Sequence, residues 1–205
     1  MTQLNYKREK RVDTDRRVLF YLILIIVLAF MVRLIGLRFG FPYLLHADEP
    51  TAVKRALLFF RDGLNPHWFA MPSCYLYLLH FSYRLYYQIS VLSGAEDILP
   101  HLWVVKTPFY LIGRLWSVLL GTATVYLVFL TGRKLYSSRA ALGAAFLIAV
   151  LPLHLLHSHY STVDVPVTFL IILSFFCSAL LLNKRRLSYY LLAGVAAGVA
   201  GGDEV

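Results

Sequence analysis

The chain has 205 residues, of which 59% are hydrophobic and only 15% are charged. A soluble domain carries about 25% charged residues, so this composition argues against a soluble protein and favours one embedded in a bilayer. The net charge is +9, but the basic residues stand at the ends of long apolar blocks, which is typical of membrane topology signals and not of nucleic acid binding.

The first segment predicts a tail followed by a membrane-spanning helix. Residues 1–17 are polar and rich in charge, and we expect them to form a disordered cytoplasmic tail. Residues 18–37 are the first apolar block, and no small-residue cleavage site follows it, so a retained helix is favoured over a cleaved signal peptide. Arg33 and Arg38 are expected to snorkel at the far end of this helix. Residues 18–205 are taken as the N-terminal part of one membrane domain.

Residues 39–113 differ from the rest of the chain and predict a large external loop. This loop holds six prolines and most of the acidic residues outside the tail. Within it, residues 68–92 are apolar, rich in tyrosine and long enough to span. If they do not span, the tail and the basic connectors at 133–139 and 184–186 all fall on the cytoplasmic side, as the positive-inside rule prefers. We therefore predict an interfacial helix there, and a spanning helix stays an open alternative.

Three further apolar blocks, at residues 115–130, 140–156 and 165–182, are each interpreted as a spanning helix. Residues 187–200 begin a fifth block, which is too short for a hydrocarbon core of about 30 Å at 1.5 Å per residue. The sequence thus predicts an all-α polytopic membrane protein with about four to five transmembrane helices and interfacial helices in its first external loop. It also predicts that the chain is the front part of a longer protein, and that this part alone lacks some of the ligand pocket.

The first polar constellation is His46, Asp48 and Glu49, which follow the first helix between two prolines. Adjacent carboxylates beside lipid are costly to bury. The functional interpretation is a general base that takes a proton from an acceptor hydroxyl or amine, with a second acid that orients the acceptor. From spacing alone, the favoured interpretation is a solvated loop whose acid caps the following helix.

The second constellation runs from His154 through His157 and His159 to Asp164, between the third and fourth predicted spans. The predicted topology places it on the same membrane face as the first constellation. The histidines match no metal-ligand motif such as HExxH, so no metal site is predicted, and a bound divalent metal stays an open alternative. Asp164 also suits the N-terminus of the next helix, since a proline follows it closely.

The third feature is Arg114, which stands alone at the outer start of the second span. Its planar guanidinium could hold a phosphate in bidentate geometry. Ordinary snorkelling toward lipid headgroups is the alternative.

Three stretches together resemble a known family. They are His46-Ala-Asp-Glu49, the run from Pro108 through Arg114 to Tyr136, and the run from Pro152 through Asp164 to Pro166. The chain, over about residues 18–182, is similar to glycosyltransferase family 39, the dolichyl-phosphate-mannose–protein mannosyltransferase-like (PMT-like) membrane glycosyltransferases. The resemblance implies a GT-C-type fold, as in aminoarabinose transferases and oligosaccharyltransferases.

The resemblance also implies an activity and a place for it. A sugar would pass from a polyprenyl-phosphate-linked donor to a protein, lipid or glycan acceptor, on the extracytoplasmic face of the plasma membrane. The implied residues are Asp48 as catalytic base, Glu49 as its acidic neighbour, Arg114 for the donor phosphate, and His46, His159 and Asp164 as active-site support. The alternative function is a non-enzymatic polytopic membrane protein, such as a transporter or lipid-binding scaffold, which would place polar groups at mid-membrane.

Overall fold

The computed structural model describes residues 3–41, 43–66, 70–93, 107–182 and 185–201, with side chains from residue 15 onward. In this described part all regular secondary structure is helical and there are no strands. The helices are α1 (Gln3–Leu34), α2 (Asp48–Asp62), α3 (Ser73–Leu92), α4 (Thr107–Leu135), α5 (Ser138–Val150), α6 (Pro152–His157), α7 (Asp164–Leu181) and α8 (Leu187–Gly201).

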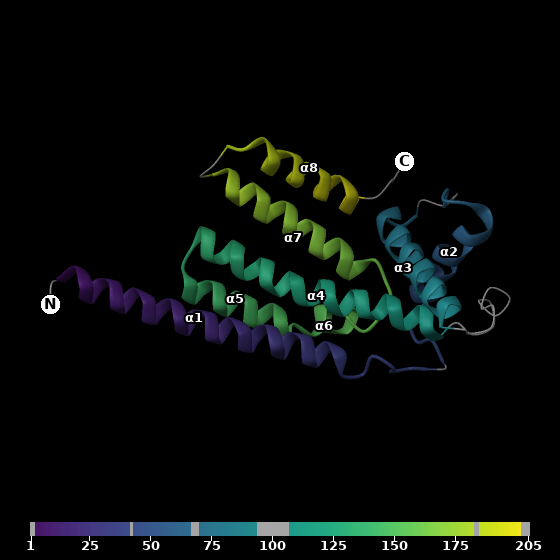
Figure 1. Ribbon diagram of the computed structural model, residues 1–205, viewed down its shortest axis with the longest axis horizontal. Helices are drawn as coiled ribbons and strands as arrows, with labels where there is room; N and C mark the ends of the chain where they lie inside the picture. Colours follow the sequence, from purple (N-terminus) through teal and green to yellow (C-terminus); the bar gives the residue numbers. More distant parts are fainter. Residues whose placement is uncertain (1–2, 42, 67–69, 94–106, 183–184, 202–205) are drawn as a thin grey trace.

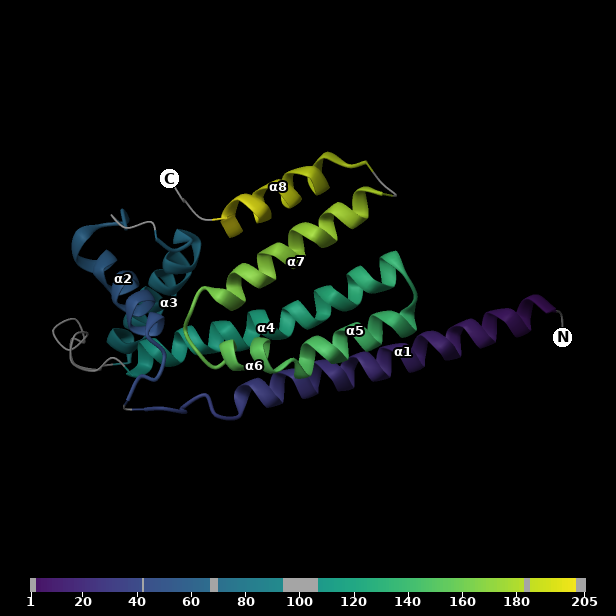
Figure 2. The ribbon, with the colours of Figure 1, turned by 180° about the vertical axis from the view of Figure 1, so that it is seen from behind.

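The long helices form a bundle around α4. Helices α1, α5 and α7 pack against α4, and α8 packs on the outer side of α7. Helices α2 and α3 gather at one end of this bundle, where α1 ends and α4 begins (Figures 1 and 2). We call this the site end, because every predicted site residue lies in a segment that meets there.

Three helical segments are long and apolar enough to cross a membrane: Asp15–Leu34, Thr107–Leu135 and Asp164–Leu181. Helices α5 and α8 are apolar but shorter. This confirms the prediction of an all-α polytopic membrane protein. Helix α3 is not among the candidate spans in the part of the chain that was searched, and its interfacial position stays a prediction.

The predicted third span, residues 140–156, is not one continuous helix. The chain leaves helical geometry at Leu151, with φ −60° and ψ 117°, and re-enters it at Pro152. A proline disfavours helical geometry in the residue before it and has no N–H to donate. The break therefore separates α5 from α6 and frees the last carbonyls of α5.

The prediction of a disordered tail at residues 1–17 is also wrong. Helix α1 begins at Gln3 and runs unbroken into the apolar block. Lysine, arginine, glutamate and glutamine favour helices, and extending an existing helix costs far less than starting one. The Arg133 Nη2 atom of α4 lies 3.6 Å from Asp15 Oδ1 of α1. The start of α1, the α4–α5 turn and the end of α7 all lie at the end opposite the site end (Figure 1).

The predicted external loop contains a packed helical unit. Helix α2 buries one face against α3 and the first turn of α4, and Tyr83 Oη donates to Phe109 O at 3.1 Å. The buried cluster consists of Ala52, Val53, Ala56, Leu57, Phe59, Tyr75, Leu76, Leu79, Tyr83, Phe109 and Tyr110. This apolar contact holds the start of α2, which carries the acidic residues, firmly against the start of α4.

Candidate functional site

A buried ion pair joins the start of α2 to α4. Glu49 and Arg114 have side-chain exposures of 0% and 1%. The Arg114 Nε donates to Glu49 Oε1 at 2.7 Å, and its Nη2 donates to Oε2 at 2.8 Å. This parallel two-bond geometry is the strongest form of an arginine–carboxylate contact, so the acidic turn is fixed relative to α4.

The same guanidinium also binds the segment that follows α1. Arg114 Nη1 donates to Leu37 O and Phe39 O, both at 2.8 Å, and the guanidinium lies 4.4 Å from the centre of the Phe41 ring. Four of the five N–H groups of a guanidinium are used in these bonds and the Glu49 pair. A phosphate would have to take the remaining N–H or compete with a protein partner, and its binding by Arg114 stays a prediction.

The second constellation meets the first through the loop between α6 and α7. The Ser161 backbone N–H donates to Glu49 Oε1 at 2.9 Å, and the Ser161 hydroxyl lies 3.0 Å from Tyr75 Oη of α3. Burial raises the pKa of Tyr75, so this phenol remains a neutral hydrogen-bonding group. Residues 46–49 and 158–164, far apart in sequence, therefore lie together as the topology predicted.

His46 completes the contact between the two acidic turns. Its ring lies 4.8 Å from the Tyr160 ring and 5.9 Å from the His157 ring. Its Nδ1 accepts the backbone N–H of Asp48 at 3.2 Å. The Asp48 side chain itself is exposed, which leaves it accessible to a molecule that approaches the site end.

Asp164 begins α7 and faces the histidine turn. Its Oδ2 accepts the Thr162 hydroxyl at 2.7 Å and lies 3.1 Å from His157 Nδ1. His159, by contrast, bridges two backbone segments: Nδ1 lies 2.9 Å from Leu155 O and Nε2 lies 2.8 Å from Ile35 O. The structure thus gives His159 a tethering position, and Asp164 a position beside a cavity.

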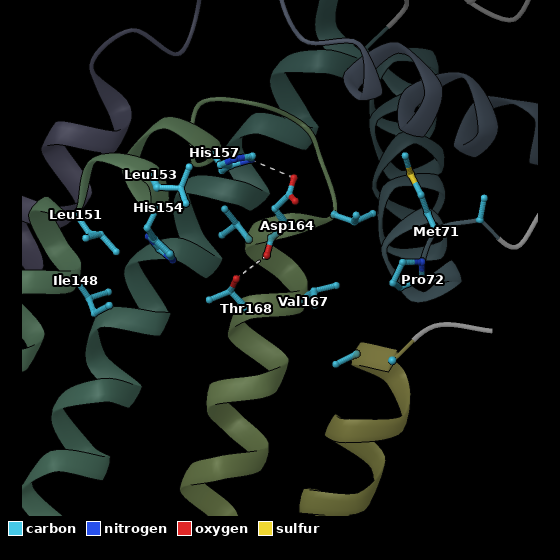
Figure 3. A pocket seen from close by; sticks show the side chains of 15 residues that line it. Met71, Pro72, Ile148, Leu151, Leu153, His154, His157, Asp164, Val167 and Thr168 are labelled. Atoms are coloured by element: carbon cyan, nitrogen blue, oxygen red, sulfur yellow. Dashed lines mark hydrogen bonds and ion pairs between the residues drawn. The ribbon is translucent and has the colours of Figure 1, made fainter. Parts of the chain in front are cut away.

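That cavity is a pocket of about 590 Å³ between α5, α6, α7, the end of α8 and the segment before α3 (Figure 3). Its lining is Ala70, Met71, Pro72, Ile148, Leu151, Leu153, His154, His157, Val163, Asp164, Val165, Val167, Thr168, Ala200 and Gly201. Its size is within the range of about 300–1,000 Å³ for small-molecule sites, which are mostly apolar with a few placed polar groups. Asp48, Glu49 and Arg114 are not among the lining residues, so the pocket adjoins the ion pair and does not contain it.

A stripe of small residues on α4 makes room for the loop. A Cβ added at Gly113 would overlap the Ser161 hydroxyl and lie 2.7 Å from Ser161 Cβ, and one at Gly121 would lie 2.8 Å from Ser158 Oγ. Between them, Ser117 Oγ donates to Tyr160 O at 2.7 Å. The spacing of four residues puts all three on one helix face. Small residues spaced by four are a recognised sign of close approach in membrane helices, so this contact had a signal in the sequence.

Arg33 is the main functional-site neighbour that sequence reasoning placed wrongly. It is completely buried and does not snorkel outward. Its Nη1 donates to Ala29 O and Ala149 O, its Nη2 to Ile148 O, and its Nε to the Ser158 hydroxyl. The guanidinium therefore caps carbonyls that the helix break frees at the end of α5, and it holds the other end of the loop that Glu49 binds.

Within the part of the chain that was searched, no group of three or more His, Cys, Asp or Glu side chains could hold a metal ion. His154, His157 and Asp164 share the pocket wall, but His154 Nδ1 is occupied by Arg33 Nη2 at 2.9 Å.

The fold defines the chain as an all-α polytopic membrane protein. Residues 109–201 match the family model described as dolichyl-phosphate-mannose-protein mannosyltransferase. Over this region the chain is similar to the PMT-like membrane glycosyltransferases, and this match bears out the resemblance predicted from its motifs. The match includes Arg114, His154 and Asp164, whereas the Asp48–Glu49 turn precedes it. No curated protein and no solved structure matches the chain.

Proposed function

We propose that the chain transfers a sugar from a polyprenyl-phosphate-linked donor to an acceptor on the extracytoplasmic side of the plasma membrane. The family match supports a glycosyltransferase. The observation that carries the proposal is the Glu49–Arg114 pair, because Glu49 also accepts the Ser161 N–H. One buried carboxylate thereby joins the two acidic turns at one end of the bundle.

In this proposal Asp48 is the general base. It accepts the proton of an acceptor hydroxyl or amine, and the acceptor atom forms a bond to the anomeric carbon of the sugar. The bond between that carbon and the phosphate oxygen breaks, and the polyprenyl phosphate leaves with the electron pair. The leaving group is already a stable anion, so a positioned base and a nearby cation supply most of what the transfer needs. The exposed position of Asp48 supports this role, since an acceptor from outside can reach it.

Glu49 and Arg114 position the base. Asp48 directly precedes Glu49, so the two bonds between Glu49 and Arg114 restrict where the Asp48 carboxylate can lie. Contact between Arg114 and the donor phosphate is part of the proposal, through the N–H that the protein bonds leave over. His46, His159 and Asp164 support the site by holding the two turns and the histidine segment in register.

The proposed side of the membrane follows from charge. The last turn of α4, which carries Arg133 and Lys134, and the start of α1 both lie at the end of the bundle opposite the site end. Positive loops stay preferentially in the cytoplasm, so the site end faces outward, where a protein, lipid or glycan acceptor would be met.

The experiment compares Asp48→Asn with a matched control, Asp62→Asn, at the other end of the same helix. Membranes containing each variant are given dolichyl-phosphate-mannose that is radiolabelled in the sugar, and loss of labelled donor is followed with time. Removal of a general base typically costs 10²–10⁴ in rate, so we expect Asp48→Asn to lose at least about a hundredfold. The Asp62 variant should keep its rate, since Asp62 pairs with Arg61 on the surface. Unchanged turnover in Asp48→Asn, at equal membrane level, would remove Asp48 as the base.

A further inference from the structure

The pocket beside Asp164 has a polar wall with an unusual composition. Its polar lining residues are Asp164, Thr168, His154 and His157, and no arginine or lysine is among the described residues that line it. Figure 3 shows the two histidines on one side and Asp164 between them and the apolar residues Met71 and Pro72. With a carboxylate in its wall and no arginine or lysine among these lining residues, the pocket disfavours an anionic group beside Asp164. It favours a neutral group that can donate hydrogen bonds to it.

His154 has a defined proton arrangement because of Arg33. Arginine carries only donors, so the contact of 2.9 Å between Arg33 Nη2 and His154 Nδ1 requires Nδ1 to accept. A neutral His154 therefore carries its proton on Nε2. The Nε2 atom is buried and has no hydrogen-bond partner among the described residues.

The local environment keeps His154 neutral at ordinary pH. Burial, the positive charge of Arg33 and the nearby His157 lower the pKa of His154 from 6.5 to about 4. A buried donor without a partner is costly, and native structures seldom retain one without a reason. Because His154 itself lines the cavity, a ligand in the cavity is the candidate for the missing acceptor.

We propose that this pocket is the subsite for the sugar of the lipid-linked donor, and that His154, oriented by Arg33, is a specificity residue that donates to a sugar hydroxyl. The same class of ligand suits both polar sides, because a hydroxyl donates to the Asp164 carboxylate while a hydroxyl oxygen accepts from His154 Nε2. The apolar lining residues then cover the carbon faces of the ring. This inference rests on the proposed function, and it adds the subsite and the residue that distinguishes a sugar-bearing lipid from a bare one.

Two substitutions separate the roles of the two ring nitrogens of His154. In His154→Asn the amide oxygen takes the place of Nδ1 and keeps an acceptor for Arg33, but the donor at the Nε2 position is lost. In His154→Gln the longer side chain returns an amide N–H to that position. Each variant, as the whole chain in lipid nanodiscs, is titrated with dolichyl-phosphate-mannose and, separately, with dolichyl phosphate. Comparing the two lipids isolates the contribution of the sugar.

We expect the unsubstituted chain to bind the mannosyl lipid more tightly than the bare lipid. His154→Asn should lose about three- to tenfold in affinity for the mannosyl lipid, the effect of one hydrogen bond, and bind the bare lipid as before. His154→Gln should regain most of this loss. Equal losses for both lipids, or no loss for either, would overturn the inference.

The outcomes also separate this inference from the proposed function. If transfer is observed but the unsubstituted chain does not prefer the mannosyl lipid, the subsite is wrong and the transferase proposal stands. If neither transfer nor preference is found, both fail.

A second measurement does not depend on any ligand. Nitrogen-15 NMR of histidine-labelled chain distinguishes the two neutral tautomers, with the His154 signal assigned by its loss in His154→Asn. The inference requires the Nε2–H form at neutral pH, and the Nδ1–H form would overturn it.

Discussion

The Glu49–Arg114 pair allows a quantitative test of how the site is held together. Removing one partner leaves the other charge buried, which typically costs 3–5 kcal/mol. We therefore expect Glu49→Leu to lower the free energy of unfolding by about 3–5 kcal/mol. Arg114→Met should cost at least as much, because Leu37 O and Phe39 O also lose their donor.

The double variant should lose much less unfolding free energy than the two single variants lose in sum. With both partners replaced by apolar side chains, no buried charge remains, and such replacements are often close to neutral. What is still lost is the set of hydrogen bonds to Ser161, Leu37 and Phe39, at about 1 kcal/mol each. For charge centres about 4 Å apart, the Coulomb attraction is about 4 kcal/mol at an effective dielectric constant of 20. We therefore expect a coupling energy of about 3–4 kcal/mol between the two sites.

The assay is equilibrium unfolding of the purified chain in mixed micelles, followed by tryptophan fluorescence. Trp116 lies in α4 near the pair and donates from Nε1 to Ser82 Oγ at 2.9 Å, so its environment changes when the site end opens. The exposed Arg61–Asp62 pair, with side-chain exposures of 69% and 39%, serves as the control cycle, and its coupling should be close to zero. Additive effects of the Glu49 and Arg114 substitutions would refute the ion pair as the organising contact.

Three further predictions test the stripe, the topology and the buried histidine. Gly113→Ala should destabilise the chain by about 1–3 kcal/mol, the usual cost of overpacking, whereas Gly143→Ala, with nothing within 4 Å of its Cβ, should be neutral in the same unfolding assay. In a cysteine-free background, Tyr43→Cys should react with an impermeant maleimide on intact cells and Tyr136→Cys only after permeabilisation. These tyrosines are 78% and 80% exposed, and reaction from the same side would contradict the topology. Because the pKa of His154 is lowered from 6.5 to about 4, the unfolded chain binds a proton that the folded chain excludes. Stability should therefore fall as the pH drops from 6.5 toward 4, and His154→Asn should weaken this dependence.

The helices that carry the site could be predicted because their signal is local. The apolar blocks at residues 115–130 and 165–182 correspond to α4, Thr107–Leu135, and α7, Asp164–Leu181. The start of α7 at Asp164 agrees with the expected acidic helix start. The block at 140–156 was predicted as one helix, although Pro152 was visible in the sequence. Apolar composition outweighed a proline signal that sequence reasoning should have used.

The partners of the charged residues could not be predicted, because partnership depends on distances between segments far apart in the chain. Arg33 and Arg114 each stand at a predicted helix end, where snorkelling is the ordinary expectation. Both are buried in the structure, since neighbouring helices supply acceptors that the local sequence does not reveal. A readable clue did exist on α4: Gly113, Ser117 and Gly121 mark where a backbone segment approaches the helix closely.

These long-range contacts explain why the loop between α6 and α7 can hold a defined site. Its first residue, Ser158, accepts from the buried Arg33, and Ser161 donates to Glu49, the partner of the buried Arg114. Two guanidiniums from different helices therefore fix the loop at both ends, and the α4 stripe supports its middle. His157 and Asp164 flank this loop, so their positions at the pocket are set before a ligand arrives. Such preorganisation lowers the reorganisation required during reaction. Holding this loop also explains why the two arginines are buried, which snorkelling toward lipid headgroups does not.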